Sequence, residues 1–513
     1  MSLKLFNTLG RKKQEFKPIK RGQVLMYTCG PTVYQYAHIG NLRAYLAADV
    51  LRRVLEYDGY KVKQIINITD VGHLTSDADT GEDKVEAAAK RAGKTAKEIT
   101  KFYADQFVYD LKALNVEMPA KFAWVSKYIR EQIDLIKRLE KKGYTYKTSD
   151  GIYFDTAKFK GYGKLAPLRQ GFGGSSSRAR VVHSKEKKRE TDFALWKFSG
   201  REKRQQEWKS PWGVGFPGWH IECSATSTAE LGQPFDIHTG GEDHIAIHHN
   251  DEIAQSEAAY GKPLARYWVH HAFIFFNISM PTLIGNIHVC PSCGHENRVP
   301  SNRGYIPMEM EDGTISLKVL CRKCRREFHS GIRVAKMSKS KGGFITLADL
   351  EENGFEPLAF RYLAISGQYR NKLNFSKSAL IGARNSLNKL RAVFNEKTKG
   401  GKVNQIYKKK FLLVINDDLN LPKAFTVVWE LLKSKKSLAD KQATLLDFDR
   451  VLGLGLKDYR PTTIPAEVKK FAQERERARK GGDWKRADKL RQEITKRGFE
   501  IKDTPTGWHI TKR

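Results

Sequence analysis

The sequence predicts an α/β protein that is built on a doubly wound parallel sheet and divided into several domains. The chain has 513 residues, which is too long for one ordinary hydrophobic core. Apolar residues make up 40% of the chain and aromatic residues 11%, which is enough to fill packed interiors and excludes disorder throughout. Near the start, a strand, a helix and a second strand follow one another within about 45 residues, as in a parallel βαβ unit.

The first strand of this unit is expected at residues 24–28 (VLMYT), a short apolar run that ends before Gly30 and Pro31. From Gly40 onward, apolar residues recur every three or four positions, which is the pattern of an amphipathic helix. Residues 62–68 (VKQIINI) form a second apolar run. Because a helix can join two strands that lie parallel in one sheet, this segment predicts the centre of the fold.

The rest of the chain alternates between helical and strand-like stretches. Residues 82–142 have a helical period, and strand-like sequence returns from Phe193 to Phe276. Residues 171–190 combine glycine, serine and charged residues, which predicts a surface loop that is either simply solvated or in contact with RNA. After Thr346 the chain is helical again.

The C-terminal segment predicts a helical hairpin. Residues 467–480 and 483–497 carry helical patterns. Gly481 and Gly482 form the expected bend between them, and Asp483 is a candidate N-cap for the second helix.

The charge balance points to a polyanionic partner. The chain has 91 Lys and Arg against 57 Asp and Glu, a formal charge of +34, and residues 461–513 alone carry 15 against 8. Such an excess repels itself in a compact state, so nucleic acid is the first candidate partner and an anionic membrane the second. No stretch approaches the roughly 18 consecutive apolar residues of a membrane span. The charged start lacks the apolar run of a secretory signal, so we expect a cytoplasmic protein without a membrane partner.

Four of the six cysteines form two tight pairs, which indicates a metal site rather than a disulfide framework. The pairs are Cys290-x2-Cys293 and Cys321-x2-Cys324, with 27 residues between them. Two such knuckles that close a hairpin predict a zinc-ribbon-like module with a structural zinc, since about 45 residues hold too small a core unaided. A nucleic-acid contact through its basic residues and a purely structural role both remain open.

Residues 31–41 (PTVYQYAHIGN) lie between the first strand and the first helix, where a parallel sheet binds phosphate. His38 and Asn41 can donate hydrogen bonds to phosphate oxygens, and Gly40 permits a close approach of the backbone. Taken alone, this pattern is weak and fits better with a turn that only begins a helix. Far downstream, residues 336–340 (KMSKS) form a cationic loop that suits a departing polyphosphate, although such loops are often only solvated.

Together, HIGN and KMSKS resemble the two signature motifs of the class I aminoacyl-tRNA synthetases, which activate an amino acid with ATP and load it on tRNA. The family usually has histidine where this chain has Asn41, and the asparagine variant is familiar in the cysteine-specific branch. The resemblance implies a Rossmann-like catalytic domain and Mg²⁺ with ATP. It also implies catalytic roles for His38, Asn41, Lys336 and Lys339, and ATP contacts from His38, Gly40, Asn41, Ser338 and Lys339.

The sequences around the other two cysteines resemble the cysteinyl-tRNA synthetases, and the resemblance covers nearly the whole chain. Cys29 begins CGPTVY, Cys223 lies in PGWHIECSA, and His248 begins HHNDEIAQSEAA. Further matching sequence segments are LFNTLGRKKQEF, NITD, DFALWK, DIHTGGEDH, LNFSKSAL, NDDLNLPKAF and DTPTGW. The implied reaction joins L-cysteine, activated by ATP as cysteinyl-adenylate, to the 3′ end of tRNA(Cys).

The residues themselves permit a second zinc site. His248 and Glu252 are four positions apart and share a helix face, and two thiolates, an imidazole and a carboxylate suit zinc. A pocket without metal separates cysteine from serine by only about 1–3 kcal/mol, whereas zinc favours a thiolate. The resemblance assigns this zinc to Cys29, Cys223, His248 and Glu252, which makes two zinc ions per chain, and lines the amino-acid pocket with Thr69, Trp219 and His238. His249 is an alternative ligand, and Trp219 is alternatively core packing.

Pattern and resemblance together divide the chain into seven segments. They are 1–115, first half of the Rossmann-like catalytic domain; 116–190, connective insertion; 191–285, second half of the catalytic domain; 286–330, zinc-ribbon-like insertion; 331–370, KMSKS connector; 371–460, helical tRNA-binding bundle; and 461–513, small basic anticodon-binding domain.

Two other functions remain open. A cysteine ligase could keep the adenylating core and pass cysteine to an amino sugar, but it would not need a basic helical C-terminus. A catalytically inactive RNA-binding protein would not need intact HIGN and KMSKS motifs or intact zinc-ligand segments.

Overall fold

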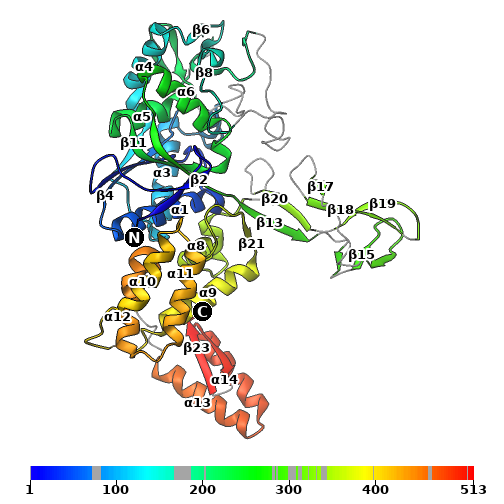
Figure 1. Cartoon of the computed structure of the whole chain (residues 1–513). Coiled ribbons are helices and arrows are strands. Elements are labelled where there is room, and N and C mark those ends of the chain that lie inside the picture. Colours follow the sequence, from blue (N-terminus) through cyan, green and yellow to red (C-terminus); the bar gives the residue numbers. More distant parts are fainter. Residues whose placement is uncertain are drawn as a thin grey trace.

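The structure is a computed structural model with an α/β body, a helical bundle, a small C-terminal domain and an arm that projects from the side (Figure 1). It describes the chain except for residues 1, 72–82, 167–185, 201–203, 280–282, 285–286, 299–307, 310–314, 322, 331, 337–343, 397, 460–464, 505–506 and 513. Residues 167–185, most of the loop predicted at 171–190, therefore lie outside the described part. Among the described helices, none combines the length and apolar character needed to cross a membrane.

The α/β body is built on one parallel five-stranded sheet in the order β12-β11-β3-β4-β5. Its strands are β3 (Gln23–Thr28), β4 (Lys61–Ile68), β5 (Lys121–Trp124), β11 (Phe235–Gly241) and β12 (Ala265–His271). The chain builds outward from β3 to β5 and later returns to the other side of β3. This confirms the predicted doubly wound sheet and places its topological switch point between β3 and β11.

Helices cover both faces of this sheet, because successive strand residues point to opposite faces. Met26 packs with α1 (Ile39–Tyr57) in one core cluster, whereas the next residue, Tyr27, packs with α5 (Ile221–Leu231) in another. The remaining helices of the body are α2 (Lys84–Ala92), α3 (Ala96–Ala113), α4 (Ile129–Lys141) and α6 (His248–Tyr260). Short 3-10 turns lie at Val125–Tyr128, Thr156–Lys158 and Glu242–His244, and the N-terminal strands β1 (Lys4–Asn7) and β2 (Lys12–Glu15) form a hairpin.

An antiparallel five-stranded sheet is inserted between β5 and β11. Its order is β6-β7-β8-β10-β9, and its core holds the fully buried Trp196 and a stacked pair, Phe154 and Phe193, with ring centroids 5.1 Å apart. The strands are β6 (Thr145–Lys147), β7 (Gly151–Phe154), β8 (Phe193–Phe198), β9 (Trp208–Ser210) and β10 (Gly213–Pro217). The sheet thus takes strands from both sides of residue 190, where the sequence placed a segment boundary.

A buried arginine joins the helical bundle to the body. Arg361 of α8 is fully buried and binds Asp49 of α1 at 2.5 Å and the carbonyl oxygen of Leu452 at 2.8 Å. Removing either partner of such a pair leaves an uncompensated buried charge. The helices of this region are α7 (Leu347–Glu352), α8 (Pro357–Ser366), α9 (Lys377–Ala392), α10 (Gln405–Ile415), α11 (Leu421–Lys433) and α12 (Leu438–Leu452).

The C-terminal domain confirms the predicted helical hairpin. It consists of α13 (Ala466–Lys480) and α14 (Trp484–Lys496), followed by the β-hairpin β22 (Phe499–Thr504) and β23 (Gly507–Lys512). The side chain of Asp483 accepts a hydrogen bond from the backbone N–H of Arg486 at 3.0 Å, so this residue is the N-cap of α14.

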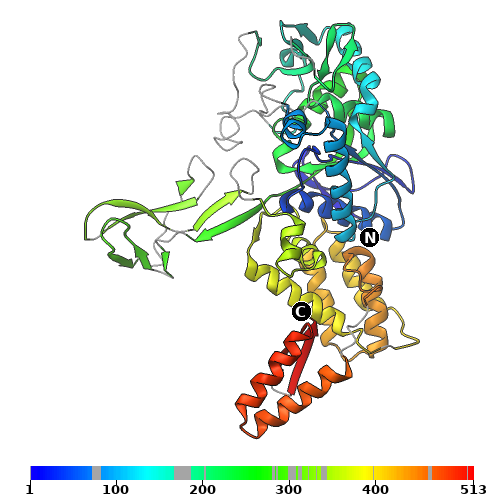
Figure 2. The ribbon, with the colours of Figure 1, turned by 180° about the vertical axis from the view of Figure 1, so that it is seen from behind.

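The arm begins where β13 (Ile274–Ser279) pairs antiparallel with β20 (Ile332–Lys336), beside β21 (Leu373–Phe375). Both views show it projecting away from the body (Figures 1 and 2). Beyond this base lie two small antiparallel sheets formed by β14 (Leu283–Ile284), β15 (Ile287–Val289), β16 (Glu296–Arg298), β17 (Met308–Glu309), β18 (Ile315–Leu320) and β19 (Glu327–Ser330).

Candidate functional site

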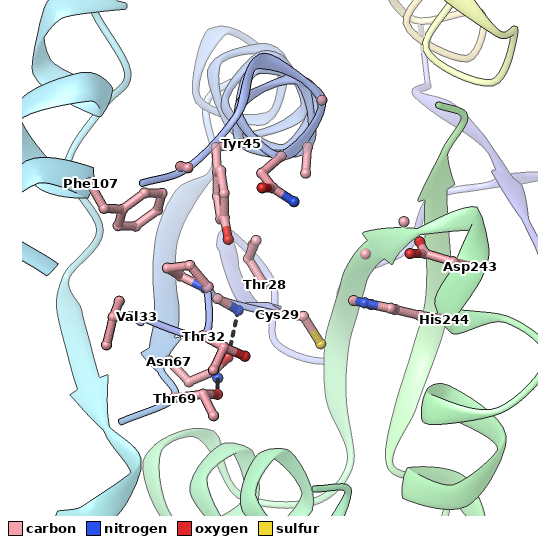
Figure 3. Close-up of a pocket in the computed structure, with 18 of the residues that line it drawn as sticks. Thr28, Cys29, Thr32, Val33, Tyr45, Asn67, Thr69, Phe107, Asp243 and His244 are labelled. Atoms are coloured by element: carbon pink, nitrogen blue, oxygen red, sulfur yellow. Dashed lines mark hydrogen bonds between the residues drawn. The ribbon is translucent and has the colours of Figure 1, made fainter. Parts of the chain in front are cut away.

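A cavity of about 330 Å³ lies at the carboxyl ends of β3 and β11, at the switch point of the sheet. Open α/β sheets bind ligands at this position. Phe107 of α3 points into the cavity from one side, and Asp243 and His244 close it on the opposite side, after β11 (Figure 3).

The HIGN motif forms the N-terminus of α1 and lines the cavity. The ring Nδ1 of His38 accepts a hydrogen bond from the backbone N–H of Asn41 at 3.1 Å, and the Asn41 side-chain oxygen accepts one from the His38 N–H at 3.3 Å. This reciprocal capping box fixes both side chains. Gly40 lies between them on the cavity wall, so the positive end of the helix dipole is available to an anion there.

The residues on both sides of segment 337–343 lie beside residues of the cavity wall. Ile39 donates its backbone N–H to the carbonyl of Ile345 at 2.8 Å, and His38 forms a β-bridge with Thr346. On the other side, Lys336 ends β20 and pairs through its backbone with Phe275, next to the cavity-lining Ile274.

Two of the KMSKS residues expected to contact ATP, Ser338 and Lys339, lie outside the described residues, as do Met337 and Ser340. For Lys336 the structure describes only the backbone.

The fold assembles the four predicted ligands of the substrate zinc. The sulfurs of Cys29 and Cys223, one ring nitrogen of His248 and one carboxylate oxygen of Glu252 all lie within 4.8 Å of one another. Cys29 follows β3, Cys223 lies in the first turn of α5, and His248 and Glu252 lie on consecutive turns of α6. His248 Nε2 is 2.9 Å from Glu252 Oε1. Because three separate elements carry these groups, the body of the protein positions them.

The electrostatics of this cluster suit a divalent cation. Burial alone would raise the pKa of Glu252, but His238 and His248 outweigh it and hold that pKa well below its ordinary value. The hydrogen bond with Cys29 lowers the pKa of the Cys223 thiol to about 6, whereas burial raises that of Cys29. Glu252 and Cys223 in turn outweigh burial and raise the pKa of His248, so an imidazolium offsets part of this negative charge until a metal ion replaces its proton.

A second group of side chains overlaps the first. Cys29 and Glu252 also lie within 4.8 Å of ring nitrogens of His238 and His249, so the geometry keeps His249 as an alternative ligand. His249 Nε2 is 3.3 Å from the Cys29 sulfur, and its Nδ1 is 2.7 Å from His270 Nε2. Among the described residues that line the cavity are Cys29, Cys223 and His248, but neither His238 nor His249. The first group therefore has most of its members on the cavity wall, whereas the second group has only Cys29 there.

The predicted amino-acid pocket is brought together in part. Thr69 and Trp219 line the cavity, and Trp219 is half-buried against His248 with ring centroids 4.7 Å apart, unlike a residue of the closed core. His238 is instead fully buried behind the cluster, with Nε2 2.8 Å from Glu252 Oε2. In this position it contacts the Glu252 carboxylate and does not line the cavity.

Several residues of the cavity wall were not predicted from the sequence, although all of them lie in sequence segments that match the family. Asn67 accepts the backbone N–H of Gly30 at 2.7 Å and donates to Thr69 at 3.0 Å (Figure 3). A Cβ on Gly30 would lie 1.5 Å from the Asn67 carbonyl oxygen, so only glycine fits there. Asp243 and His244 belong to DIHTGGEDH. Asn67 lies near the end of a predicted strand, whereas Asp243 and His244 lie in the stretch predicted only as strand-like, which gave no signal for them.

The four remaining cysteines form a separate cluster on the arm. The sulfurs of Cys290, Cys293, Cys321 and Cys324 lie within 4.8 Å of one another, and two cross-pairs, Cys290 with Cys324 and Cys293 with Cys321, are 3.6 Å apart. Four thiolates at tetrahedral spacing are a typical structural zinc set.

The two cysteine turns of this cluster have the same backbone pattern. The carbonyl of Cys290 accepts the N–H of Gly294, and the carbonyl of Cys321 accepts that of Arg325, at 2.8 and 3.0 Å. Gly294 and Arg325 both have left-handed backbone conformations, with φ of 67° and 59°. This repetition is the geometry of two knuckles that hold one ion.

Family models match both ends of the chain. The model of tRNA synthetases class I (C) catalytic domain matches residues 15–291, and that of the cysteinyl-tRNA ligase anticodon binding domain matches residues 462–510. A methionyl-tRNA synthetase of Mycobacterium tuberculosis in complex with methionyl-adenylate has the same fold, with a TM-score of 0.52, 15% identity, and coverage of 85% of this chain and 92% of that one. The fold and the matched catalytic domain define a class I aminoacyl-tRNA synthetase.

Full-length relatives specify the branch. Cysteine–tRNA ligase 1 of Burkholderia lata is 43% identical, with 99% of this chain and 97% of the relative covered. Cysteine–tRNA ligase of Zymomonas mobilis is 36% identical, with 98% and 96% covered. The chain belongs to the cysteine–tRNA ligase family.

Proposed function

We propose that this chain activates L-cysteine with ATP to give cysteinyl-adenylate and then transfers cysteine to the 3′ end of tRNA(Cys). The observation that carries the proposal is the convergence of Cys29, Cys223, His248 and Glu252, of which the first three line the cavity that also holds the N-terminus of α1. Amino-acid selection and phosphate binding would thus take place in one cavity. The family matches at both ends of the chain support the tRNA substrate.

In the first step, a carboxylate oxygen of cysteine attacks the α-phosphorus of ATP, and the bond to pyrophosphate breaks. His38, Asn41 and the N-terminus of α1 would stabilise the phosphate charge. The lysines of the KMSKS motif, Lys336 and Lys339, would balance the charge of the departing pyrophosphate. Mg²⁺ is expected to accompany ATP. In the second step, a ribose hydroxyl of tRNA attacks the acyl carbon and displaces AMP. Positioning and charge stabilisation suffice for both steps, so no covalent enzyme intermediate is needed.

Cys29, Cys223, His248 and Glu252 would hold the substrate zinc, while His238 keeps the Glu252 carboxylate oriented. When bound, this zinc supplies a soft Lewis acid that a thiolate ligates better than a hydroxyl does. Thr69 and Trp219 would contact the remainder of the amino acid. A second zinc, held by the four arm cysteines, would be structural. All six cysteines are free thiols in the structure, which fits the cytoplasm, where we place the protein.

The test is cysteine-dependent exchange of pyrophosphate into ATP, followed by charging of tRNA(Cys) transcript. We expect exchange with cysteine, little exchange with serine, and charged tRNA. Failure of exchange would refute an adenylating enzyme. Exchange without charging, together with transfer of cysteine to an amino sugar, would instead identify the ligase alternative.

A further inference from the structure

Three aromatic rings from α3 and from the segment before α1 contact one another beside the cavity. The ring of Tyr36 is 5.2 Å from that of Tyr103 and 6.1 Å from that of Phe102, and the rings of Phe102 and Tyr103 are 5.1 Å apart. All three pairs are edge-to-face. We call Tyr36, Phe102 and Tyr103 the aromatic cluster.

The aromatic cluster leads from the cavity to the surface. Tyr103 lines the cavity, whereas Tyr36 and Phe102 lie outside it and are 40% and 41% exposed. Large exposed rings are normal when scattered singly, but three rings in mutual contact form an apolar surface that marks a binding site. Neither the proposed ATP contacts nor the proposed cysteine pocket uses Tyr36 or Phe102.

Cations surround these rings. Lys94 lies over the Phe102 ring at 5.8 Å, and Lys84, which lines the cavity, lies over the neighbouring Tyr34 ring at 6.0 Å. Further exposed cations of α2, α3 and the turn between them are Lys90, Arg91 and Lys97, whereas the exposed Lys101 is paired with Asp105 at 2.8 Å. Exposed carboxylates are fewer on this stretch, and the side chain of one of them, Glu98, is engaged in the capping box of α3 with Thr95.

Rings bordered by lysines are the combination that binds unpaired nucleotides, because each base stacks on a ring while the cations meet the phosphates. We propose that the aromatic cluster is the stacking platform for the unpaired 3′-terminal nucleotides of the tRNA. This proposal rests on the proposed function, since the terminal ribose must reach the cavity while the preceding nucleotides remain outside it. ATP is a less suitable occupant, because its phosphates belong at the N-terminus of α1 inside the cavity.

The test compares Phe102→Ala and Tyr36→Ala with the unmodified enzyme in both half-reactions. Exchange of pyrophosphate in the absence of tRNA should be unchanged, with the same KM for ATP and for cysteine. The kcat/KM for tRNA in charging should fall by about 5- to 150-fold, the range that loss of one stacked base produces. Phe102→Trp should restore charging, because it keeps a ring at that position.

A matched control is Tyr109→Ala, which removes a 57% exposed ring from the same helix without touching the aromatic cluster. It should leave charging unchanged. A second measurement uses tRNA that lacks its last three nucleotides as a competitor. It should compete less well than intact tRNA against the unmodified enzyme, and equally well against Phe102→Ala.

Unchanged charging by both alanine variants would overturn the platform alone. A raised KM for ATP would also overturn it, because it would assign the rings to ATP. Absence of cysteine-dependent exchange in the unmodified enzyme would overturn the proposed function and the platform together.

Discussion

The two cysteine clusters of this chain are built in opposite ways. The mixed cluster of Cys29, Cys223, His248 and Glu252 is buried, and its members come from a strand end and two helices that are distant in sequence. The arm cluster of four cysteines lies on a projecting hairpin, and its ligands come in two local C-x2-C turns.

This difference separates the roles of the two sites. The mixed cluster is held by a sheet and by helices that have cores of their own, and its cysteines are part of the cluster of buried side chains on that face of the sheet. Among the arm side chains that the structure describes, by contrast, the buried cluster consists of the cysteines themselves. The fold therefore positions the mixed cluster by itself, whereas we expect the arm to depend on a bound metal for its folding. Of these two clusters, the mixed cluster borders the described cavity and offers an ion ligands of three kinds, whereas the arm cluster offers four thiolates.

The largest expected contrast is between one serine substitution in each cluster. Cys223→Ser should reduce cysteine-dependent pyrophosphate exchange by more than about 100-fold, because loss of a direct ligand exceeds the roughly 10- to 100-fold cost of losing an outer partner. Cys290→Ser should change exchange by less than about threefold, because the arm cluster lies outside the cavity. Metal analysis should show that each variant loses one zinc per chain. Full retention of zinc by Cys223→Ser would contradict its assignment.

Removal of both metals with a chelator should unfold only the arm. The arm is too small to hold a core without a metal, whereas the central sheet has a large apolar core on each face. Amide exchange followed by peptide mass analysis should show loss of protection in residues 286–330 and retained protection in β3, β4 and β11. An arm that stays protected without metal would remove the basis of the comparison.

A smaller contrast is expected for the histidines next to each cluster. His238 holds the Glu252 carboxylate with its side chain, whereas His295 contacts the arm cluster through its backbone, with its carbonyl 2.9 Å from the Cys290 nitrogen. His238→Asn should therefore weaken binding of the substrate zinc by about 10- to 100-fold. His295→Asn should leave the arm zinc unaffected. Competition with a chromophoric chelator measures both affinities, and equal effects of the two substitutions would refute this reading.

The smallest effect concerns the two turns of the arm. Gly294 and Arg325 occupy equivalent left-handed positions, and this conformation disfavours a side chain by about 1 kcal/mol. Arg325→Gly should therefore tighten zinc binding by about fivefold, and Gly294→Ala should weaken it by a similar factor. The same chelator competition applies, and Ser292→Ala in the first turn is the control. A change of opposite sign in either variant would show that the turns are not equivalent.

Local patterns allowed the centre of the fold to be predicted from sequence. The strand at residues 24–28 and the helix that follows it stand out because their apolar residues have the right period, and the hairpin near Asp483 stands out because its capping residues lie at fixed spacing. The antiparallel sheet could not be predicted from such local patterns. Its strands β7 and β8 pair across almost 40 residues of intervening chain, and pairing over such a distance leaves no local signal.

The candidate site was predictable where a motif carries its own geometry. His38 and Asn41 form a local capping box, and the i, i+4 spacing placed His248 and Glu252 on one helix face. The meeting of these groups with Cys29 is a long-range consequence of the sheet, and only the family resemblance anticipated it. The position of His238 behind Glu252, rather than in the pocket, depends on which face of β11 each residue occupies relative to α6, and no spacing in the sequence specifies that.

The central proposal is that the mixed cluster selects cysteine over serine. The most direct measurement is the ratio of pyrophosphate exchange with cysteine to that with serine, before removal of metal, after removal, and after zinc is restored. We predict a ratio above the roughly 200-fold that pocket shape alone can give, its collapse in the metal-free enzyme, and its recovery with zinc. A metal-free enzyme that still prefers cysteine by the full ratio would contradict the account.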